Sequence, residues 1–211
     1  MKRSLTRWTL AGWCVGLGAV ALFDVAPATA DETPNVVSTV SDPAGDTVFI
    51  FNAPFQDFVR GQMTRTASGN FELLMEMVDP VPIHPPLRPG VREIWWFWIF
   101  NLDPATDPHG YPWQNAVGRP PEFIVYIRWD GAEFAGNAID RRPLLTGGKA
   151  IITPVPFHID GKIVEEVLAS ELIGDVPPSF HWGPFTFDWS GPVGSEGVSF
   201  ADYCEADAVF P

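Results

Sequence analysis

Residues 59–77 decide the fold, and they read VRGQMTRTASGNFELLMEM. In the second half of this stretch, apolar residues at every second position from Phe71 to Met77 alternate with Glu72, Leu74 and Glu76. A period of two is typical of a β-strand with one buried face. Residues 59–64 show the same period, and Ala67-Ser68-Gly69-Asn70 between the two runs favours a turn. The stretch therefore predicts a β-hairpin.

A second decisive stretch is Trp95-Trp96-Phe97-Trp98-Ile99-Phe100, which is apolar at every position. Such a run predicts a central strand covered on both faces. We predict further strands at 47–52, 93–102, 122–129, 133–139, 150–155, 162–168 and 179–187. The one helical pattern spans 169–173 and is closed by Gly174. Together these patterns predict an all-β fold, an antiparallel β-sandwich with jelly-roll or immunoglobulin-like layering, about nine or ten strands and at most one short helix.

The composition agrees with a folded, acidic domain. The 211 residues are 46% hydrophobic and include 9 Trp and 16 Phe, which is enough apolar material to form a sizeable core. The formal net charge is −13. An acidic chain is repelled by phosphate backbones and anionic lipids, so we expect no nucleic-acid partner and no membrane-surface role.

The first thirty residues have the layout of a secretory signal peptide. Lys2, Arg3 and Arg7 precede an apolar run over residues 10–23, and Ala28-Thr29-Ala30 offers a small-residue cleavage site. We therefore predict a cleaved signal at 1–30, a single domain at 31–211, and export to the periplasm or the extracellular space without stable membrane insertion. Cleavage removes three basic residues and one acidic residue, which leaves 10 against 25 and a net charge of −15. Cys204 is then the single cysteine, so no intramolecular disulfide is expected.

Two short acidic turns are candidates for a metal site. Asp42-Pro43-Ala44-Gly45-Asp46 and Asp103-Pro104-Ala105-Thr106-Asp107 each place two carboxylates four residues apart. Ca²⁺ prefers oxygen ligands, and loops of this kind supply several, so we predict Asp42, Asp46, Asp103 and Asp107 as calcium ligands. The alternative is that Asp simply favours turns by hydrogen bonding to its own backbone.

A proline-rich loop is the candidate ligand site. His109, Tyr111 and Trp113 lie together in the sequence DPHGYPW at 107–113. Indole and phenol faces on a stiff loop suit stacking against sugar rings or other flat ligands. The alternative is that Trp113 folds back to cover the core. Nucleophilic catalysis finds no support, because no G-x-S-x-G turn is present.

The arrangement of acidic motifs resembles exported β-sandwich modules of the DOMON and family 9 carbohydrate-binding type. The similar features are the Asp42–Asp46 turn, Asp57-Phe58, Asn101-Leu102-Asp103-Pro104 and the closing Asp207-Ala208-Val209-Phe210-Pro211. The resemblance implies a jelly-roll-like sandwich that binds a sugar or haem, sometimes with structural calcium. It also implies Met with His or Lys as axial ligands in haem-binding members. Here Met63, Met75 and Met77 alternate as core residues do, so we do not expect haem.

The leading functional hypothesis is a secreted, non-catalytic domain that binds a small, carbohydrate-like extracellular ligand, together with structural calcium. The main alternative is a cell-envelope structural or protein-interaction domain without a small ligand. A haem-binding domain and a glycoside-active enzyme using paired carboxylates remain minor alternatives.

Overall fold

The computed structural model of the chain describes residues 35–47, 53–103, 121–191, 198–203 and 208–211, which all belong to one compact unit, Thr33–Pro211. The predicted signal peptide, the 107–113 loop and Cys204 lie outside the described residues.

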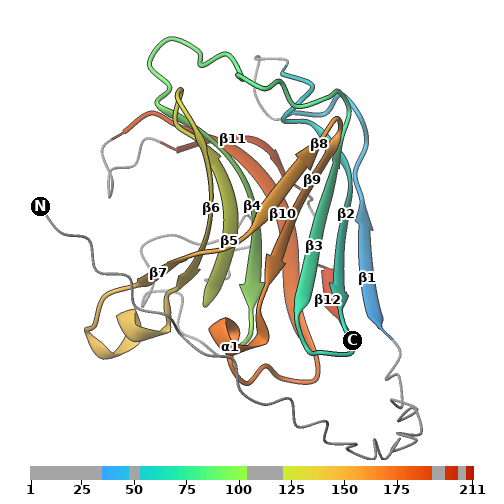
Figure 1. Cartoon of the computed structure of the whole chain (residues 1–211), viewed down its shortest axis with the longest axis vertical. Helices are drawn as coiled ribbons and strands as arrows, with labels where there is room; N and C mark the ends of the chain where they lie inside the picture. The colour runs from blue at the N-terminus through green and yellow to red at the C-terminus, as the bar shows by residue number, and fades with distance from the viewer. Residues whose placement is uncertain (1–34, 48–52, 104–120, 192–197, 204–207) are drawn as a thin grey trace, which may run out of the picture. The chain divides into compact units, whose positions relative to one another are not determined.

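Two antiparallel sheets face each other in this unit (Figure 1). The five-stranded sheet has the order β1 (Val36–Ser41), β2 (Phe58–Arg65), β3 (Phe71–Met77), β9 (Ile163–Leu168) and β8 (Phe157–Asp160). The seven-stranded sheet has the order β11 (Val198–Tyr203), β10 (Phe180–Trp189), β4 (Glu93–Asn101), β5 (Phe123–Trp129), β6 (Phe134–Asp140) and β7 (Ile151–Pro154), and β12 (Ala208–Phe210) also pairs with β10. The prediction of an all-β antiparallel sandwich is therefore confirmed.

The described residues form twelve strands, more than the nine or ten expected. Four strands were not predicted, namely β1, β8, β11 and β12. The predicted strand at 47–52 falls mostly on residues that the structure does not describe. The helical content of the described residues is the single turn α1 (Ser170–Ile173), as predicted, and a 3-10 turn at Arg142–Thr146.

The predicted hairpin is β2 and β3, with Met63 opposite Leu73 and Gly61 opposite Met75. The side chains of Met63, Phe71, Leu73 and Met75 are at most 1% exposed and lie in the core between the sheets. Met77 is also buried, so the methionines are core residues.

The apolar run at 95–100 is β4, at the centre of the seven-stranded sheet. Trp96, Trp98 and Phe100 point into the core between the two sheets. Phe97 and Ile99 belong to a second apolar cluster, formed with residues of β5 and β10 on the other face of the same sheet. Both faces of β4 are therefore buried from Trp96 to Asn101, as predicted, whereas Trp95 near its start is partly exposed.

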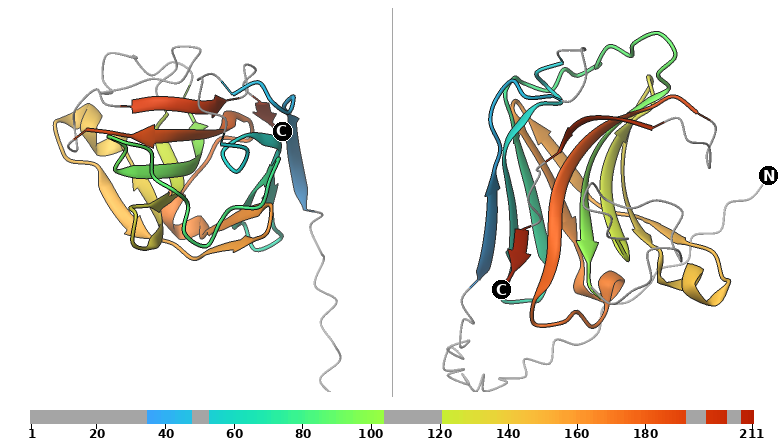
Figure 2. Two further views of the ribbon diagram at one scale, coloured as in Figure 1. Left: turned by 90° about the horizontal axis from the view of Figure 1, so that it is seen from above. Right: turned by 180° about the vertical axis from the view of Figure 1, so that it is seen from behind.

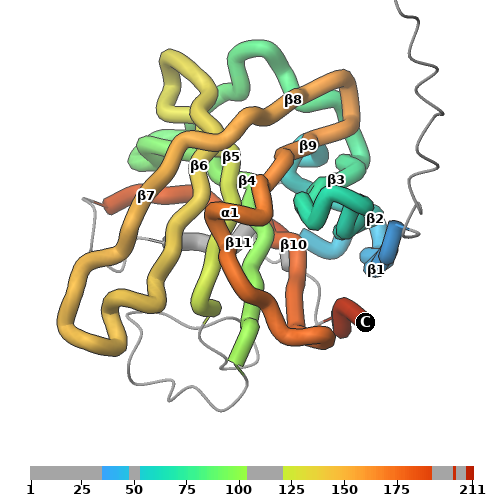
Figure 3. The backbone as a smooth tube through the Cα atoms, turned by 60° about the horizontal axis from the view of Figure 1, so that its bottom comes forward, coloured from blue at the N-terminus to red at the C-terminus, as the bar shows by residue number. Residues whose placement is uncertain are grey.

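Short strands close the ends and edges of the sandwich. β11 pairs with Phe185–Trp189 of β10 and β12 pairs with Phe180–Trp182, so both extend the same edge of β10 (Figure 2). β7 runs into β8 through only Val155 and Pro156, so the chain passes directly from the edge of one sheet to the edge of the other (Figure 3). Among the described residues, no helix is long and apolar enough to cross a membrane.

Candidate functional site

The first acidic turn wraps around the carboxylate of Asp57. The backbone N–H of Gly45 donates to Asp57 Oδ2 at 2.8 Å. Gly45 has φ +86°, a backbone conformation that glycine adopts without the strain of a side chain. At the start of the turn, the backbone N–H of Asp42 donates to the carbonyl of Val59 at 3.0 Å. These bonds hold residues 42–46 against the beginning of β2.

Asp202 reaches the same place from β11. Its Oδ2 accepts a 2.8 Å hydrogen bond from the backbone N–H of Phe58, the first residue of β2. One carboxylate oxygen each from Asp42, Asp46 and Asp202 lie within 4.8 Å of one another. We call Asp42, Asp46, Asp57 and Asp202 the carboxylate cluster.

The carboxylate cluster brings four acidic side chains together, and two of them are buried from solvent. Asp57 and Asp202 are each 1% exposed, and no salt bridge between described residues reaches either of them. Burial raises the pKa of Asp202 to about 8; the hydrogen bond from Phe58 opposes this and the charges of the other three carboxylates add to it. Burial likewise raises the pKa of Asp57, against the hydrogen bond from Gly45. The cluster is therefore costly to ionise without a counter-charge.

The donor set fits a hard divalent cation. Ca²⁺ binds oxygen at about 2.3–2.6 Å, so two of its ligands are separated by up to roughly 5 Å, which matches the spacing of the Asp42, Asp46 and Asp202 oxygens. Asp57 Oδ1 is buried and has no hydrogen-bond partner among the described residues. Buried polar atoms are normally paired, so this orphaned oxygen is an independent indication of a ligand.

The structure brings together two of the four predicted metal residues, Asp42 and Asp46. Asp103 lies elsewhere, because it follows Asn101, which pairs with His181 near the start of β10, whereas Asp202 pairs with Thr186 farther along that strand. Asp107 lies outside the described residues. Sequence reasoning did not place Asp57 or Asp202 beside the 42–46 turn; Asp57 was noted only in the Asp57-Phe58 pair of the family resemblance.

A row of aromatic rings lies on the face of the seven-stranded sheet that points away from the core. Trp95 on β4 stacks on Tyr126 of β5, with ring centroids 4.1 Å apart and planes at 7°, and on Trp189 of β10 at 6.1 Å and 22°. Trp95 and Trp189 are partly exposed, whereas Tyr126 is 5% exposed and burial raises its pKa to about 12. We call Trp95, Tyr126 and Trp189 the aromatic shelf.

Charged groups border the aromatic shelf. Trp95 Nε1 donates to Glu93 Oε2 at 2.6 Å, and Arg128 Nη1 donates to Glu93 Oε1 at 2.9 Å. Arg128 also lies 3.8 Å from Asp130, whose pKa is lowered by the backbone N–H groups of Glu133 and Ala132. The shelf thus combines partly open indole faces with fixed hydrogen-bonding groups.

The ligand residues predicted from the sequence, His109, Tyr111 and Trp113, lie outside the described residues, so their prediction stays untested. Trp95 and Trp189 were not predicted to bind a ligand. Trp95 belongs to the apolar run of β4, and nothing in that run distinguishes its partly exposed ring from its buried neighbours.

Comparisons with family models, with curated proteins and with solved structures find no significant match to this chain.

Proposed function

We propose that this chain is an exported, non-catalytic binding domain that holds Ca²⁺ at the carboxylate cluster and binds a carbohydrate-like ligand on the aromatic shelf. The observation that carries the calcium part is the convergence of Asp42 and Asp46, from the turn after β1, with Asp202 of the distant strand β11. Asp57, buried beneath the 42–46 turn, supplies a fourth carboxylate.

The cation has a structural role in this proposal. Asp42 and Asp46 follow β1 of one sheet, and Asp202 belongs to β11 of the other. A bound Ca²⁺ neutralises their mutual repulsion and joins the two sheets at this end. Calcium sites in extracellular modules often have dissociation constants of about 10⁻⁴–10⁻³ M, so the ion is easily lost at low calcium concentration.

Calorimetric titration of chelator-treated protein with CaCl₂ tests the metal site, with thermal melts recorded in the same buffers. We expect saturable binding and a rise in melting temperature. Asp57→Asn should weaken Ca²⁺ binding at least about tenfold, because it removes a buried charge from the site. Asp103→Asn is the matched control and should leave the affinity unchanged. Absence of binding, or equal effects of both variants, would overturn the calcium proposal.

The aromatic shelf supports the ligand part. Sugar rings present flat C–H faces that pack on indole and phenol rings, and their hydroxyl groups need nearby acceptors and donors. Trp95 and Trp189 supply the partly open rings, and the Glu93–Arg128 pair supplies fixed polar groups beside them. Because Glu93 is held by Trp95 and Arg128 already, the shelf needs little rearrangement to accept a ligand.

Titration against a panel of neutral oligosaccharides, with and without CaCl₂, tests the ligand. We expect binding with quenching of tryptophan fluorescence, reduced at least tenfold by Trp95→Ala or Trp189→Ala. Phe157→Ala changes an aromatic side chain that is 38% exposed on the other sheet, and it should have no effect. If no oligosaccharide binds to the folded protein, the result would contradict the ligand proposal and favour the structural or protein-interaction role in the cell envelope.

A further inference from the structure

A cavity of about 440 Å³ lies at the end of the sandwich where β10 finishes and β4 begins. It sits between the turn at residues 53–56 and the proline-rich loop at 86–89, and Ile94 and Asp188 also line it. Of the ten described residues that line it, seven are apolar, and the polar ones are Gln56, Arg88 and Asp188. A cavity of this size and lining is within the range that holds small organic molecules.

The polar groups of the cavity lie at different depths. Asp188 is 2% exposed, and its Oδ1 accepts a 2.8 Å hydrogen bond from Gln56 Nε2. Its other oxygen, Oδ2, is paired with Nη2 of Arg88, whose side chain is 26% exposed. The carboxylate is therefore the deeper group, and the guanidinium is the charged group that a molecule entering the cavity meets first.

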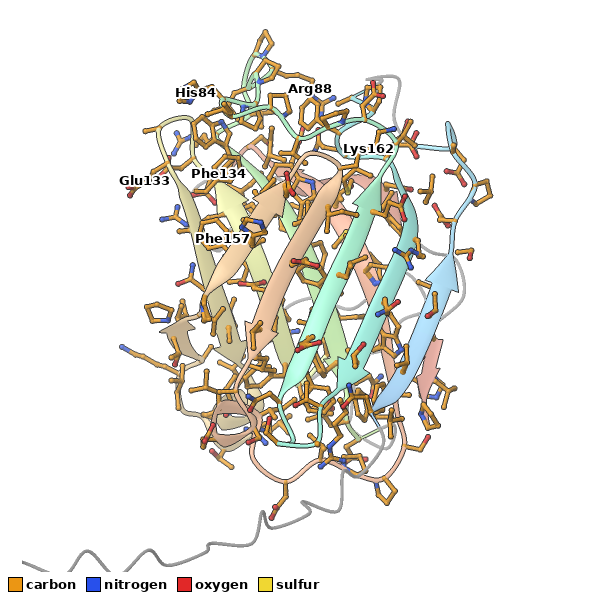
Figure 4. The ribbon with its side chains drawn as sticks, turned by 45° about the vertical axis from the view of Figure 1, so that its right-hand side comes forward. His84, Arg88, Glu133, Phe134, Phe157 and Lys162 are labelled. Atoms are coloured by element: carbon orange, nitrogen blue, oxygen red, sulfur yellow. The ribbon has the colours of Figure 1, made fainter. Side chains whose placement is uncertain are left out.

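The loop that carries His84 and Arg88 lies at one end of the sandwich (Figure 4), and three contacts hold it there. The His84 ring lies 5.7 Å from that of Trp129, and the backbone N–H of Arg92 donates to Trp189 at 2.7 Å. Leu87 packs so closely on Gly131 that a Cβ added there would lie 2.9 Å from Leu87 Cδ1. The loop wall of the cavity is thus formed before any ligand arrives.

The opposite wall is fastened in the same way. Trp96 Nε1 donates to the carbonyl of Phe55 at 3.1 Å, and Thr186 Oγ1 donates to the carbonyl of Gln56 at 2.6 Å. Both donors are buried residues of the seven-stranded sheet. Binding into such a cavity loses little conformational entropy of the protein.

We propose that this cavity binds a small apolar molecule carrying one carboxylate, with the carboxylate on the guanidinium of Arg88 and the apolar body between Phe55 and Leu87. A guanidinium has five N–H donors in a planar fork, which suits carboxylate oxygens. The buried Asp188 holds that fork in one orientation, so the cation is positioned in advance. The Arg88 side chain is 26% exposed, so its guanidinium is partly withdrawn from water, where bonds to an anion are stronger; this burial also lowers its pKa.

None of the residues that line this cavity belongs to the carboxylate cluster or the aromatic shelf, so the proposal does not depend on either of them. Benzoate and hexanoate are the carboxylate probes, benzamide is the neutral analogue and benzylamine the cationic one. Titration followed by NMR chemical shifts should show benzoate and hexanoate binding at least tenfold more tightly than benzamide. Tighter binding of benzamide or benzylamine, or no binding of any probe, would overturn the proposal.

The variants separate the local contact from the charge of the whole protein. Arg88→Gln should weaken benzoate binding at least tenfold. Arg92→Gln makes the same change of charge at an exposed side chain of the same loop and should have little effect. Because Arg88→Gln leaves Asp188 buried without its cation, a double variant with Asp188→Asn keeps the site neutral and should also lose benzoate. Equal losses in the Arg88 and Arg92 variants would show only long-range attraction and refute the site.

Discussion

Asp202 Oδ2 accepts the backbone N–H of Phe58 at 2.8 Å, and this bond joins two strands, β11 and β2, that belong to opposite sheets. The two residues are 144 positions apart in the sequence. A carboxylate that is 1% exposed, surrounded by three others, thus connects the sandwich layers at this end. Its protonation state should therefore influence how tightly the layers hold together.

The first prediction concerns pH in the absence of metal. Burial raises the pKa of Asp202 from 3.8 to about 8, so the folded protein keeps a proton that the unfolded chain has released. The stability contributed by this proton is complete below about pH 4 and is lost as pH rises towards 8, by at most about 1.4 kcal/mol per pH unit. Urea unfolding in chelator at several pH values measures it, and Asp202→Asn should flatten the dependence.

Calcium should abolish that trend. A bound cation keeps Asp202 ionised in the folded protein, as it is in the unfolded chain above about pH 4, so with saturating CaCl₂ the free energy of unfolding should no longer fall as pH rises towards 8. A pH profile that is the same with chelator and with calcium would contradict the assignment of Asp202 as a ligand.

The second prediction concerns Glu166, which is 1% exposed in β9 and faces Gly136 of the other sheet. Burial raises its pKa well above 4.5, so its contribution to stability is complete at acidic pH and lost as pH rises through the folded-state pKa. Glu166→Gln should therefore stabilise the protein at pH 8 and change little at pH 4. Glu165→Gln, on the opposite face of β9, makes the same change of charge and is the control; equal effects of the two variants would contradict the assignment to Glu166.

The sandwich could be predicted from the sequence because its central strands carry their pattern in their own residues. The 59–77 hairpin alternates with a period of two, and the 95–100 run is apolar on both faces; each behaves accordingly in the structure. Strands β1, β8 and β12 were not predicted, because they are short edge strands with exposed positions. Their pairing depends on neighbours far away in the chain, which local periodicity does not reveal.

The members of the carboxylate cluster also differ in whether local sequence could predict them. Asp42 and Asp46 are local, since a single turn brings them together, and the sequence pattern predicted them. Asp202 joins them only because β11 pairs with β10 at the level of Thr186. Asp103 begins a similar stretch of sequence, but β4 carries it towards the other end of β10. Spacing in the sequence identifies an acidic turn, whereas the strand register decides which turn gains further ligands.

A third prediction concerns a close approach between the two sheets at Gly61. Gly61 of β2 faces Pro184 of β10, and a Cβ added at Gly61 would lie 2.6 Å from Pro184 Cγ and 2.9 Å from Val40 Cγ2. Both contacts are too short, so Gly61→Ala must push strands apart, at a cost of about 1–3 kcal/mol. For a domain of this size that lowers the melting temperature by roughly 2–4 °C per kcal/mol. Gln62→Ala, on the other face of β2, should cost clearly less, and equal losses would mean that the sheets adjust freely here.

The last prediction concerns the bond that closes the opposite corner of the sandwich. Trp182 Nε1 of β10 donates to Ser38 Oγ of β1 at 2.9 Å, and Ser38 Oγ donates to the carbonyl of Val209 in β12 at 3.1 Å. Trp182 is fully buried, so Ser38→Ala leaves its indole N–H without this acceptor in a place that water does not reach. Such an unpaired buried donor costs about 1–3 kcal/mol.

Thr39→Ala is the matched control, because Thr39 is the next residue of β1 and its side chain is exposed. Urea unfolding monitored by tryptophan fluorescence should show a lower midpoint for Ser38→Ala and a nearly unchanged midpoint for Thr39→Ala. Equal midpoints for the two variants would mean that the serine hydroxyl contributes nothing to joining β1, β10 and β12. A selective loss would show instead that a single hydroxyl fastens this edge strand, whose own side chains bury little apolar surface.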